Sequence, residues 1–196
     1  TLFRSESKAL GVIFPEIDTL FGIPQNKKWH PEIDTGIHTL MVLEQAALLS
    51  ERLDVRYAAL THDLGKALTA KHEWPSHKGH EQKGLALVER LADRLRVPKR
   101  FKKLSRVVCE YHLHTHRALE LKPSTVLKLL EACDAFRNPE EWQGFLMACE
   151  ADARGRTGLE KIDYPNAKFL NSLYEAAKSV DGGAIAKQLQ NGTEIA

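Results

Sequence analysis

The stretch YAALTHDLGK, from Tyr57 to Lys66, sets a histidine beside an aspartate at the end of what otherwise reads as a buried helix. We expect Gly65 to end this helix, because glycine suits the backbone of a helix C-terminus. Burial gives no reason for the pair His62-Asp63. Adjacent helical residues point about 100° apart, yet both can reach one ion near the helix end. Imidazole with carboxylate suits divalent transition metals; a plain hydrogen bond from Asp63 to nearby backbone is the alternative.

Helical periodicity of apolar residues recurs along the rest of the chain. Asp34 or Thr35 is expected to cap the helix that carries His38. We find no run of alternating apolar and polar residues and no internal repeat, so we predict an all-α fold, a compact bundle of about seven or eight helices. The alternative is a short hairpin in the connection 66–77. The expected helices lie within residues 34–53, 55–66, 77–97, 99–116, 123–138, 140–156 and 167–180.

The ends of the chain are expected to differ from its middle. Thr1 is not a methionine, and the first residues read as the interior of a helix. We therefore expect either a fragment of a longer protein or an added start. We predict a connecting helical segment over 1–30, the domain itself over 31–180, and a weakly ordered tail over 181–196.

Composition limits the class of protein. The chain has 196 residues, 43% apolar and 28% charged, with a net charge of only +2. Such a chain is no polycation, so contact with nucleic acid would need a local basic patch. No apolar run approaches the roughly 18 residues of a membrane span, and we expect no signal peptide. Three scattered cysteines indicate reduced thiols, so we expect a cytoplasmic protein without membrane contact.

All nine histidines lie between His30 and His116. In this region GIHTLMVLEQ, AALTHDLGK and HKGHE resemble the successive motifs of the HD superfamily of metal-dependent phosphohydrolases, and LLEACDAFRNPEEW resembles its last motif. The blocks 14–39 and 150–165 further resemble the C-terminal part of bacterial CCA-adding enzymes that carry an HD domain. The resemblance covers about residues 7–180, and the fold of the family is all-α.

The resemblance implies a set of metal ligands and a reaction. The ligands would be His38, His62, Asp63 and Asp134, and Asp63 could also take the proton from the attacking water. Asp152 is the rival of Asp134, but its arginine neighbours suit phosphate better than a cation. The carboxylate of Asp134, in an apolar helix, would be costly without a metal.

Further side chains are candidates for substrate contact. A flexible Lys66 could hold a phosphate oxygen, or be a solvated surface lysine. His77, His80 and His112 could bind substrate, which we favour, or hold a second metal. The alternation in YHLHTH suggests that its helix ends near His112.

Arginines and the remaining histidines leave alternatives open. Arg154 and Arg156 could contact phosphates, although an Arg-Asp lock that holds the turn is slightly favoured. The basic run 99–103 is interpreted as a solvated helix start. The remaining histidines are interpreted as surface or hydrogen-bonded core residues, namely His30, His72, His114 and His116.

The resemblance implies 2′,3′-cyclic phosphodiesterase, 2′-nucleotidase and phosphatase activities on nucleotide or RNA-end phosphoesters, with tRNA as a partner. It implies nickel for the phosphatase and magnesium for the cyclic phosphodiesterase, and the donor types also admit manganese or cobalt. A non-catalytic tRNA-holding module is the alternative, which the intact ligand set disfavours. We expect a monomer or weak homodimer. The Gly-Ser and paired carboxylates of a nucleotidyltransferase are not found, so this chain alone is not expected to add C or A.

Overall fold

The computed structural model describes residues 8–180, and within this range the secondary structure is helical without a named strand. The predicted all-α fold is therefore confirmed, although nine α-helices are found there instead of seven or eight, because two short helices precede the main bundle. The predicted tail 181–196 lies outside the described residues. The α-helices are α2 (Ala9–Ile13), α3 (Pro15–Asp18), α4 (Thr35–Leu49), α5 (Leu53–Thr61), α6 (His80–Arg94), α7 (Lys99–His116), α8 (Pro123–Ala132), α9 (Pro139–Arg154) and α10 (Pro165–Lys178).

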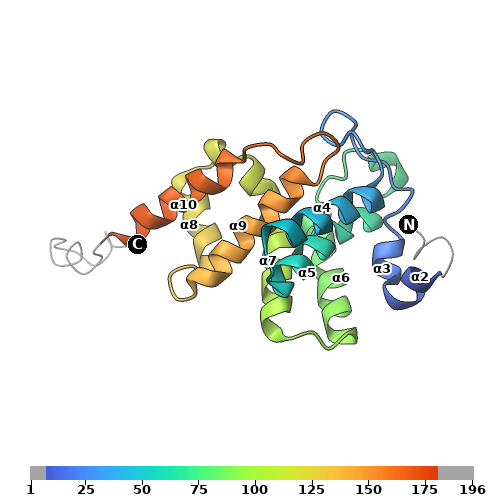
Figure 1. Ribbon diagram of the computed structural model, residues 1–196, viewed down its shortest axis with the longest axis horizontal. Helices are drawn as coiled ribbons and strands as arrows, with labels where there is room; N and C mark the ends of the chain where they lie inside the picture. Colours follow the sequence, from blue (N-terminus) through green and yellow to red (C-terminus); the bar gives the residue numbers. More distant parts are fainter. Residues whose placement is uncertain (1–7, 181–196) are drawn as a thin grey trace.

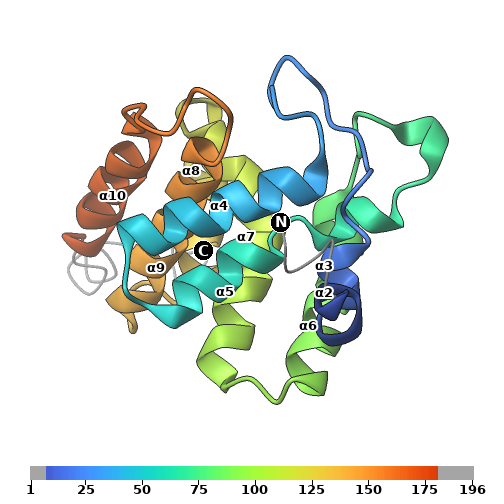
Figure 2. The same ribbon diagram turned by 45° about the vertical axis from the view of Figure 1, so that its right-hand side comes forward.

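Helices α4, α5, α7 and α9 pack against one another and form the centre of the bundle (Figure 1). Helix α6 packs along α7, while α8 and α10 lie at one end of the molecule and α2 and α3 at the other, as both views show (Figures 1 and 2). None of the described helices is long and apolar enough to span a bilayer.

Local sequence signals explain where several helices begin. The Asp34 side chain caps α4 by accepting a hydrogen bond from the Ile37 amide at 2.9 Å, as predicted. Proline opens α8, α9 and α10, where its missing N–H costs no intrahelical hydrogen bond. The sequence thus sets these boundaries before tertiary packing contributes.

The apolar core falls into two main clusters. The larger one joins α5, α7, α8, α9 and α10 around Trp142, which stacks on Phe145 and contacts the Tyr174 ring. The second joins α2, α3, α6 and α7 around residues such as Leu20 and Leu91. All three cysteines are free, as predicted, and they are buried in this interior.

Two expectations about helix ends are wrong. Helix α5 ends at Thr61, before Gly65, which lies in the short 3₁₀ helix Leu64–Leu68. Gly65 is required there by close packing, since a Cβ at this position would lie 1.8 Å from the carbonyl oxygen of His80. Helix α7 continues beyond His112 to His116. The connection 66–77 holds that 3₁₀ helix and a second, Lys71–Glu73, instead of a hairpin.

Candidate metal centre

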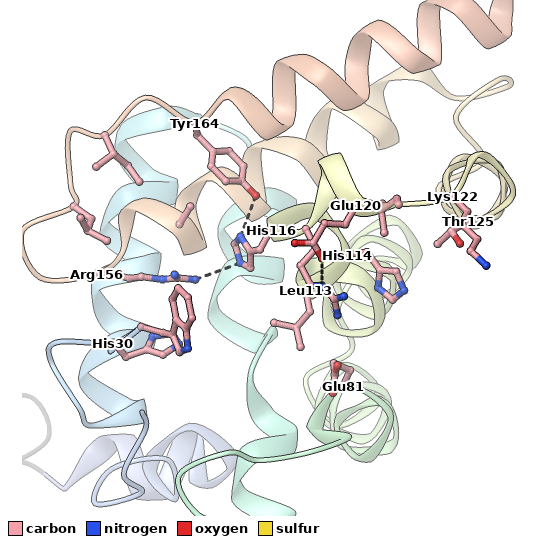
Figure 3. A pocket seen from close by; sticks show the side chains of 16 residues that line it. His30, Glu81, Leu113, His114, His116, Glu120, Lys122, Thr125, Arg156 and Tyr164 are labelled. Carbon is pink, nitrogen blue, oxygen red and sulfur yellow. Dashed lines mark hydrogen bonds and ion pairs between the residues drawn. The ribbon is translucent and has the colours of Figure 1, made fainter. Parts of the chain in front are cut away.

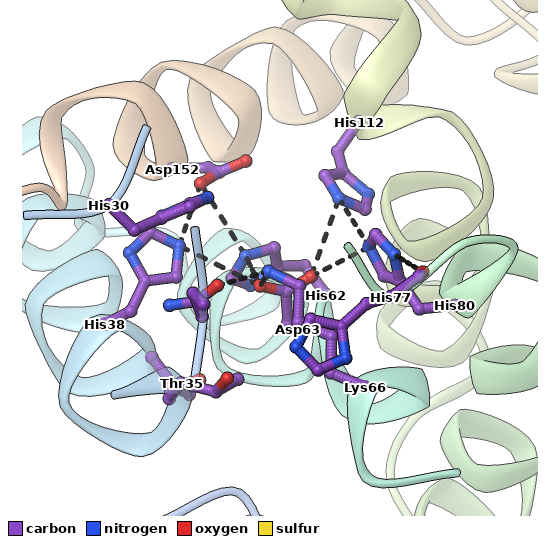
Figure 4. A network of polar contacts seen from close by, with 12 residues as sticks. His30, Thr35, His38, His62, Asp63, Lys66, His77, His80, His112 and Asp152 are labelled. Atoms are coloured by element: carbon purple, nitrogen blue, oxygen red, sulfur yellow. Dashed lines mark hydrogen bonds and ion pairs between the residues drawn. The ribbon is translucent and has the colours of Figure 1, made fainter. Parts of the chain in front are cut away.

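Six buried ionisable side chains converge where α4, α5, α6, α7 and α9 meet (Figure 4). Helix α4 supplies one histidine, the end of α5 supplies the His-Asp pair, α6 and α7 each supply a histidine, and α9 supplies an aspartate. Each of these side chains belongs to a residue that is at most 5% exposed. The cluster consists of His38, His62, Asp63, His80, His112 and Asp152.

The backbone fixes the orientation of all four histidine rings. Each Nδ1 lies within hydrogen-bond distance of a main-chain carbonyl oxygen: Gly155 for His38, Ala59 for His62, His77 for His80, and Val108 for His112. A carbonyl can only accept, so each Nδ1 carries the proton. In the neutral form of each ring, Nε2 then keeps the lone pair with which histidine ligates metals.

The first group of donors surrounds Asp152. The Oδ1 atom of Asp152 lies 3.1 Å from His38 Nε2 and 3.7 Å from His62 Nε2. Oδ2 of Asp63 lies 3.2 Å from His62 Nε2 and 3.9 Å from His38 Nε2. Two imidazoles and two carboxylates therefore face a common centre.

The second group shares Asp63 with the first. The other oxygen of Asp63, Oδ1, lies 3.1 Å from His80 Nε2 and 3.7 Å from His112 Nε2, and these two nitrogens are 3.4 Å apart. Two facing lone pairs repel each other unless a cation lies between them. Asp63 thus stands between two donor groups, which Figure 4 shows on either side of it.

The donor set fits a divalent cation. His62 Nε2 and Asp63 Oδ1 are buried and have no hydrogen-bond partner, and an unsatisfied buried polar atom is costly unless an ion completes it. Burial alone would raise the pKa of Asp63, but His62 and Lys66 hold it well below the usual range. The pKa of Asp152 is likewise held low despite burial, by His116 and His62. Two ionised carboxylates therefore face the imidazole nitrogens of the cluster.

An outer set of contacts orients this centre on the side of α4. The Glu32 carboxylate lies 3.0 Å from His38 Nδ1 and 3.1 Å from His30 Nδ1, and its other oxygen accepts from the Thr157 amide at 3.3 Å. Burial lowers the pKa of His30 to about 4, so this ring is neutral near pH 7. A carboxylate behind a metal-binding histidine fixes the ring and raises its basicity.

A second outer contact orients the carboxylate of α9. His116 Nε2 lies 2.6 Å from Asp152 Oδ2, and its Nδ1 lies 3.0 Å from the Tyr164 hydroxyl. The Arg156 guanidinium lies 3.7 Å from Asp152 and 3.4 Å from His116 Nε2. Asp152 is therefore held from behind while its Oδ1 faces the centre.

The structure does not bring Asp134 to this cluster. Helix α8 ends at Ala132, so Asp134 lies in a turn with φ of 54° instead of in an apolar helix. Its carboxylate pairs with Lys103 and Arg137 and accepts from the Asn138 amide. These partners compensate the carboxylate charge, so the free-energy cost of an unpaired charge no longer indicates a metal at Asp134. The expectation for this residue is corrected: Asp152 faces the histidines in its place.

The sequence predicts a flexible or a solvated Lys66, and both expectations are wrong. Lys66 is 6% exposed, and its ammonium lies 2.5 Å from both Asp63 Oδ2 and the Gln25 side-chain oxygen. The 3₁₀ helix after His62-Asp63 turns Lys66 back toward the aspartate. Its charge therefore acts on the centre itself.

Three other candidates differ in their placement. Both ring nitrogens of His77 already have partners, the Thr69 hydroxyl at 2.6 Å and the Pro24 carbonyl at 2.8 Å, which favours a structural role over substrate contact. Arg154 pairs with Glu150. Arg156, by contrast, reaches Asp152. It therefore forms the expected contact between an arginine and an aspartate and also lies beside the centre.

Sequence reasoning missed His30, Glu32 and His116 and ranked Asp152 below Asp134. One signal for His116 was available: it follows His112 by four residues, so one face of a continuous helix presents both. His114, two residues from each of them, lies beside the ring of Tyr111 instead. Nothing in the sequence marks Glu32, because its two histidine partners meet it only after α4 and its preceding loop have packed.

A cleft of about 880 Å³ adjoins the centre (Figure 3). His30, His116 and Arg156 line the end of the cleft near the buried cluster, while Lys122 and Thr125 lie at the other end. A small molecule could therefore reach the outer contacts of the buried centre from solvent through this cleft.

The sequence profile described as HD domain matches residues 35–138, more than half of the chain. The chain therefore belongs to the HD domain family. It is also similar over nearly its whole length to three multifunctional CCA proteins: 51% identical over 97% of this chain to that of Hahella chejuensis, 54% over 95% to that of Vibrio campbellii, and 56% over 93% to that of Nitrosococcus oceani. The chain spans a little under half of these relatives, 45%, 46% and 47% of their lengths.

Proposed function

We propose that this chain is the HD domain of a tRNA CCA-adding protein and that it hydrolyses phosphoesters with bound divalent metal. The observation that carries the proposal is the convergence of four histidine Nε2 lone pairs on two buried, ionised carboxylates. We further propose 2′,3′-cyclic phosphodiesterase, 2′-nucleotidase and phosphatase activities on nucleotides or RNA ends. Relatives of this chain that are called multifunctional CCA proteins support the tRNA context.

The proposed ligands are His38, His62, Asp63 and Asp152 for one ion and Asp63, His80 and His112 for a second. This set replaces Asp134 and moves His80 and His112 from substrate contact to metal binding. The many imidazoles favour nickel, cobalt or manganese over magnesium, although magnesium remains the proposed ion for the cyclic phosphodiesterase.

Each nearby side chain has a proposed task. A bound divalent ion supplies a Lewis acid and a water with a pKa near neutrality. Asp63 would be the group that takes the proton of the attacking water, and Lys66 would stabilise this carboxylate in its ionised form. Arg156 and His116 stand between the centre and the cleft, where a guanidinium and an imidazole can hold phosphate oxygens.

The test is to strip the protein of metal and to add nickel, cobalt, manganese or magnesium back singly. Hydrolysis of 2′,3′-cyclic AMP, 2′-AMP and p-nitrophenyl phosphate is then measured, with metal content determined by mass spectrometry. Asp63→Asn and Asp152→Asn should lose both metal and turnover, because Asp63 faces four imidazoles of the cluster and Asp152 faces two. Asp134→Asn is the matched control and should retain both. Full metal content and rate in Asp152→Asn would refute the proposed ligand set.

A further inference from the structure

The loop before α4 holds an exposed tryptophan at the cleft. Trp29 lines the cleft and is 57% exposed, although large aromatic side chains are usually well buried. The Lys28 ammonium lies 4.7 Å from the centre of its ring. An exposed ring with a neighbouring cation is a surface on which a flat, electron-rich group beside a phosphate can stack.

Trp29 lies in a turn that backbone hydrogen bonds to Asn26 hold in place. The amide nitrogens of Trp29 and His30 donate to the carbonyl of Asn26 at 3.0 and 2.9 Å, and the Asn26 side chain accepts from Lys28 N–H. The next ring, His30, packs edge-on against His38 with 4.6 Å between centroids and is held by Glu32. The turn at Asn26 therefore places Trp29 directly before His30, whose ring contacts a proposed metal ligand.

The remaining walls of the cleft suit a nucleoside with a backbone. Leu113, Leu159 and Ile162 add apolar surface, which suits a base or a ribose face. Lys122, at the end away from the centre, forms no ion pair with any residue that the structure describes, whereas Arg117 is already paired with Glu120. Lys122 is thus a cation available to a phosphate at the end of the cleft away from the centre.

We propose that the cleft binds the 3′-terminal nucleotide of an RNA strand, with its base stacked on Trp29 and the preceding phosphate at Lys122. This inference rests on the proposed function, since the terminal 2′,3′-cyclic or 2′-phosphate would lie at the metal centre. Bases of single-stranded RNA are commonly recognised by stacking on aromatic side chains, which tolerates every base. The substrate class is then an RNA end of two or more nucleotides in preference to a free phosphate ester.

The first experiment compares adenosine 2′,3′-cyclic phosphate with ribose 2′,3′-cyclic phosphate, which lacks the base. Trp29→Ala should lower the ratio of their kcat/KM values about tenfold, within the range found for one stacked base. Trp29→Phe should restore most of the ratio because it keeps an aromatic face. An unchanged ratio in Trp29→Ala would overturn the stacking assignment.

The second experiment lengthens the substrate by one nucleotide, to CpA with a terminal 2′,3′-cyclic phosphate. The dinucleotide should have a kcat/KM at least threefold above that of the mononucleotide. Lys122→Ala should lose this gain, and Lys128→Ala, an exposed lysine of α8 that does not line the cleft, should keep it. A gain that survives in Lys122→Ala, or no gain in the unmodified chain, would refute the placement of the RNA backbone.

A binding measurement separates this inference from the proposed reaction. Adenosine 3′-phosphate is titrated into metal-free protein while tryptophan fluorescence is followed, with Trp29→Phe as the reference. Hydrolysis of ribose cyclic phosphate without base-dependent binding would uphold the proposed function and refute the cleft assignment. Base-dependent binding through Trp29 without any hydrolysis would do the reverse. Equal binding of a phosphoserine peptide would also count against recognition of a nucleotide.

Discussion

Replacement of Glu32 by glutamine tests whether the outer contacts tune the metal centre. One oxygen of Glu32 faces Nδ1 of both His30 and His38, and the other accepts from the Thr157 amide. A carboxamide cannot satisfy all three donors. Either its NH₂ group faces the Thr157 N–H, or it faces the two imidazole N–H groups. In both orientations the charge that makes His38 a stronger base is lost.

The structure also limits the size of the effect. Loss of a carboxylate behind a ligating histidine typically costs about 10- to 100-fold in metal affinity. The Gly155 carbonyl lies 3.0 Å from the same His38 nitrogen and still accepts its proton, so the ring keeps its tautomer. We therefore expect the lower end, about tenfold, or about 1.4 kcal/mol in binding free energy.

The assay is competition for nickel or manganese between the protein and a chromogenic chelator, with turnover measured in parallel. Glu44→Gln, an exposed position on α4, is the matched control and should bind metal like the unmodified chain. Circular dichroism checks that both variants fold. Metal affinity of Glu32→Gln within twofold of the control would refute the reasoning, because the carboxylate would then contribute nothing to His38.

Three further predictions concern the fold. Gly65→Ala should destabilise the protein by about 3 kcal/mol or more, seen as a lower midpoint of thermal unfolding, because the added Cβ would overlap the backbone of His80; an unchanged midpoint would show that the backbone there yields easily. Burial raises the pKa of Cys109 to about 12, so this thiol should not react with a disulfide reagent at pH 8 until the protein is denatured; rapid reaction of the native protein would contradict this. Burial alone would raise the pKa of Asp54, but the ion pair with Arg52 outweighs burial and lowers it. The pair therefore stabilises the fold fully above the ordinary carboxyl pKa, and this stabilisation is lost as the pH falls through the lowered pKa. Arg52→Gln should reduce the midpoint of thermal unfolding more at pH 7 than at pH 3, and equal losses would argue against the ion pair.

Local signals predicted most of the fold but not its turns. The helical period, the Asp34 cap and the prolines that begin helices act within a few residues, so the sequence alone indicates them. The role of Gly65 depends on the backbone of α6, and no local rule contains that contact. From the sequence alone, Gly65 looks like a helix stop, although the actual reason for a glycine there is close packing against a distant helix.

The site divides in the same way. The spacing of His62, Asp63 and His38 was informative, because these residue types have little other reason to occupy buried helices. The choice between Asp134 and Asp152 required knowledge of which carboxylate is buried among the histidines. Asp134 is exposed enough to find lysine and arginine partners, whereas Asp152 is buried and meets histidines. Burial of an aspartate on a helix depends on packing, which the sequence did not resolve.

The extent of the functional unit follows from this geometry. The family match ends at residue 138, yet Asp152 and the Gly155 carbonyl that orients His38 both come from the end of α9. The same helix carries Trp142, which is fully buried in the larger apolar cluster. A chain cut at residue 138 would thus lose a carboxylate that balances the histidines, the acceptor that sets a tautomer, and the centre of the core. The candidate metal centre depends on α4 to α9 together, because packing of α9 against α4 brings the carboxylate of Asp152 to His38.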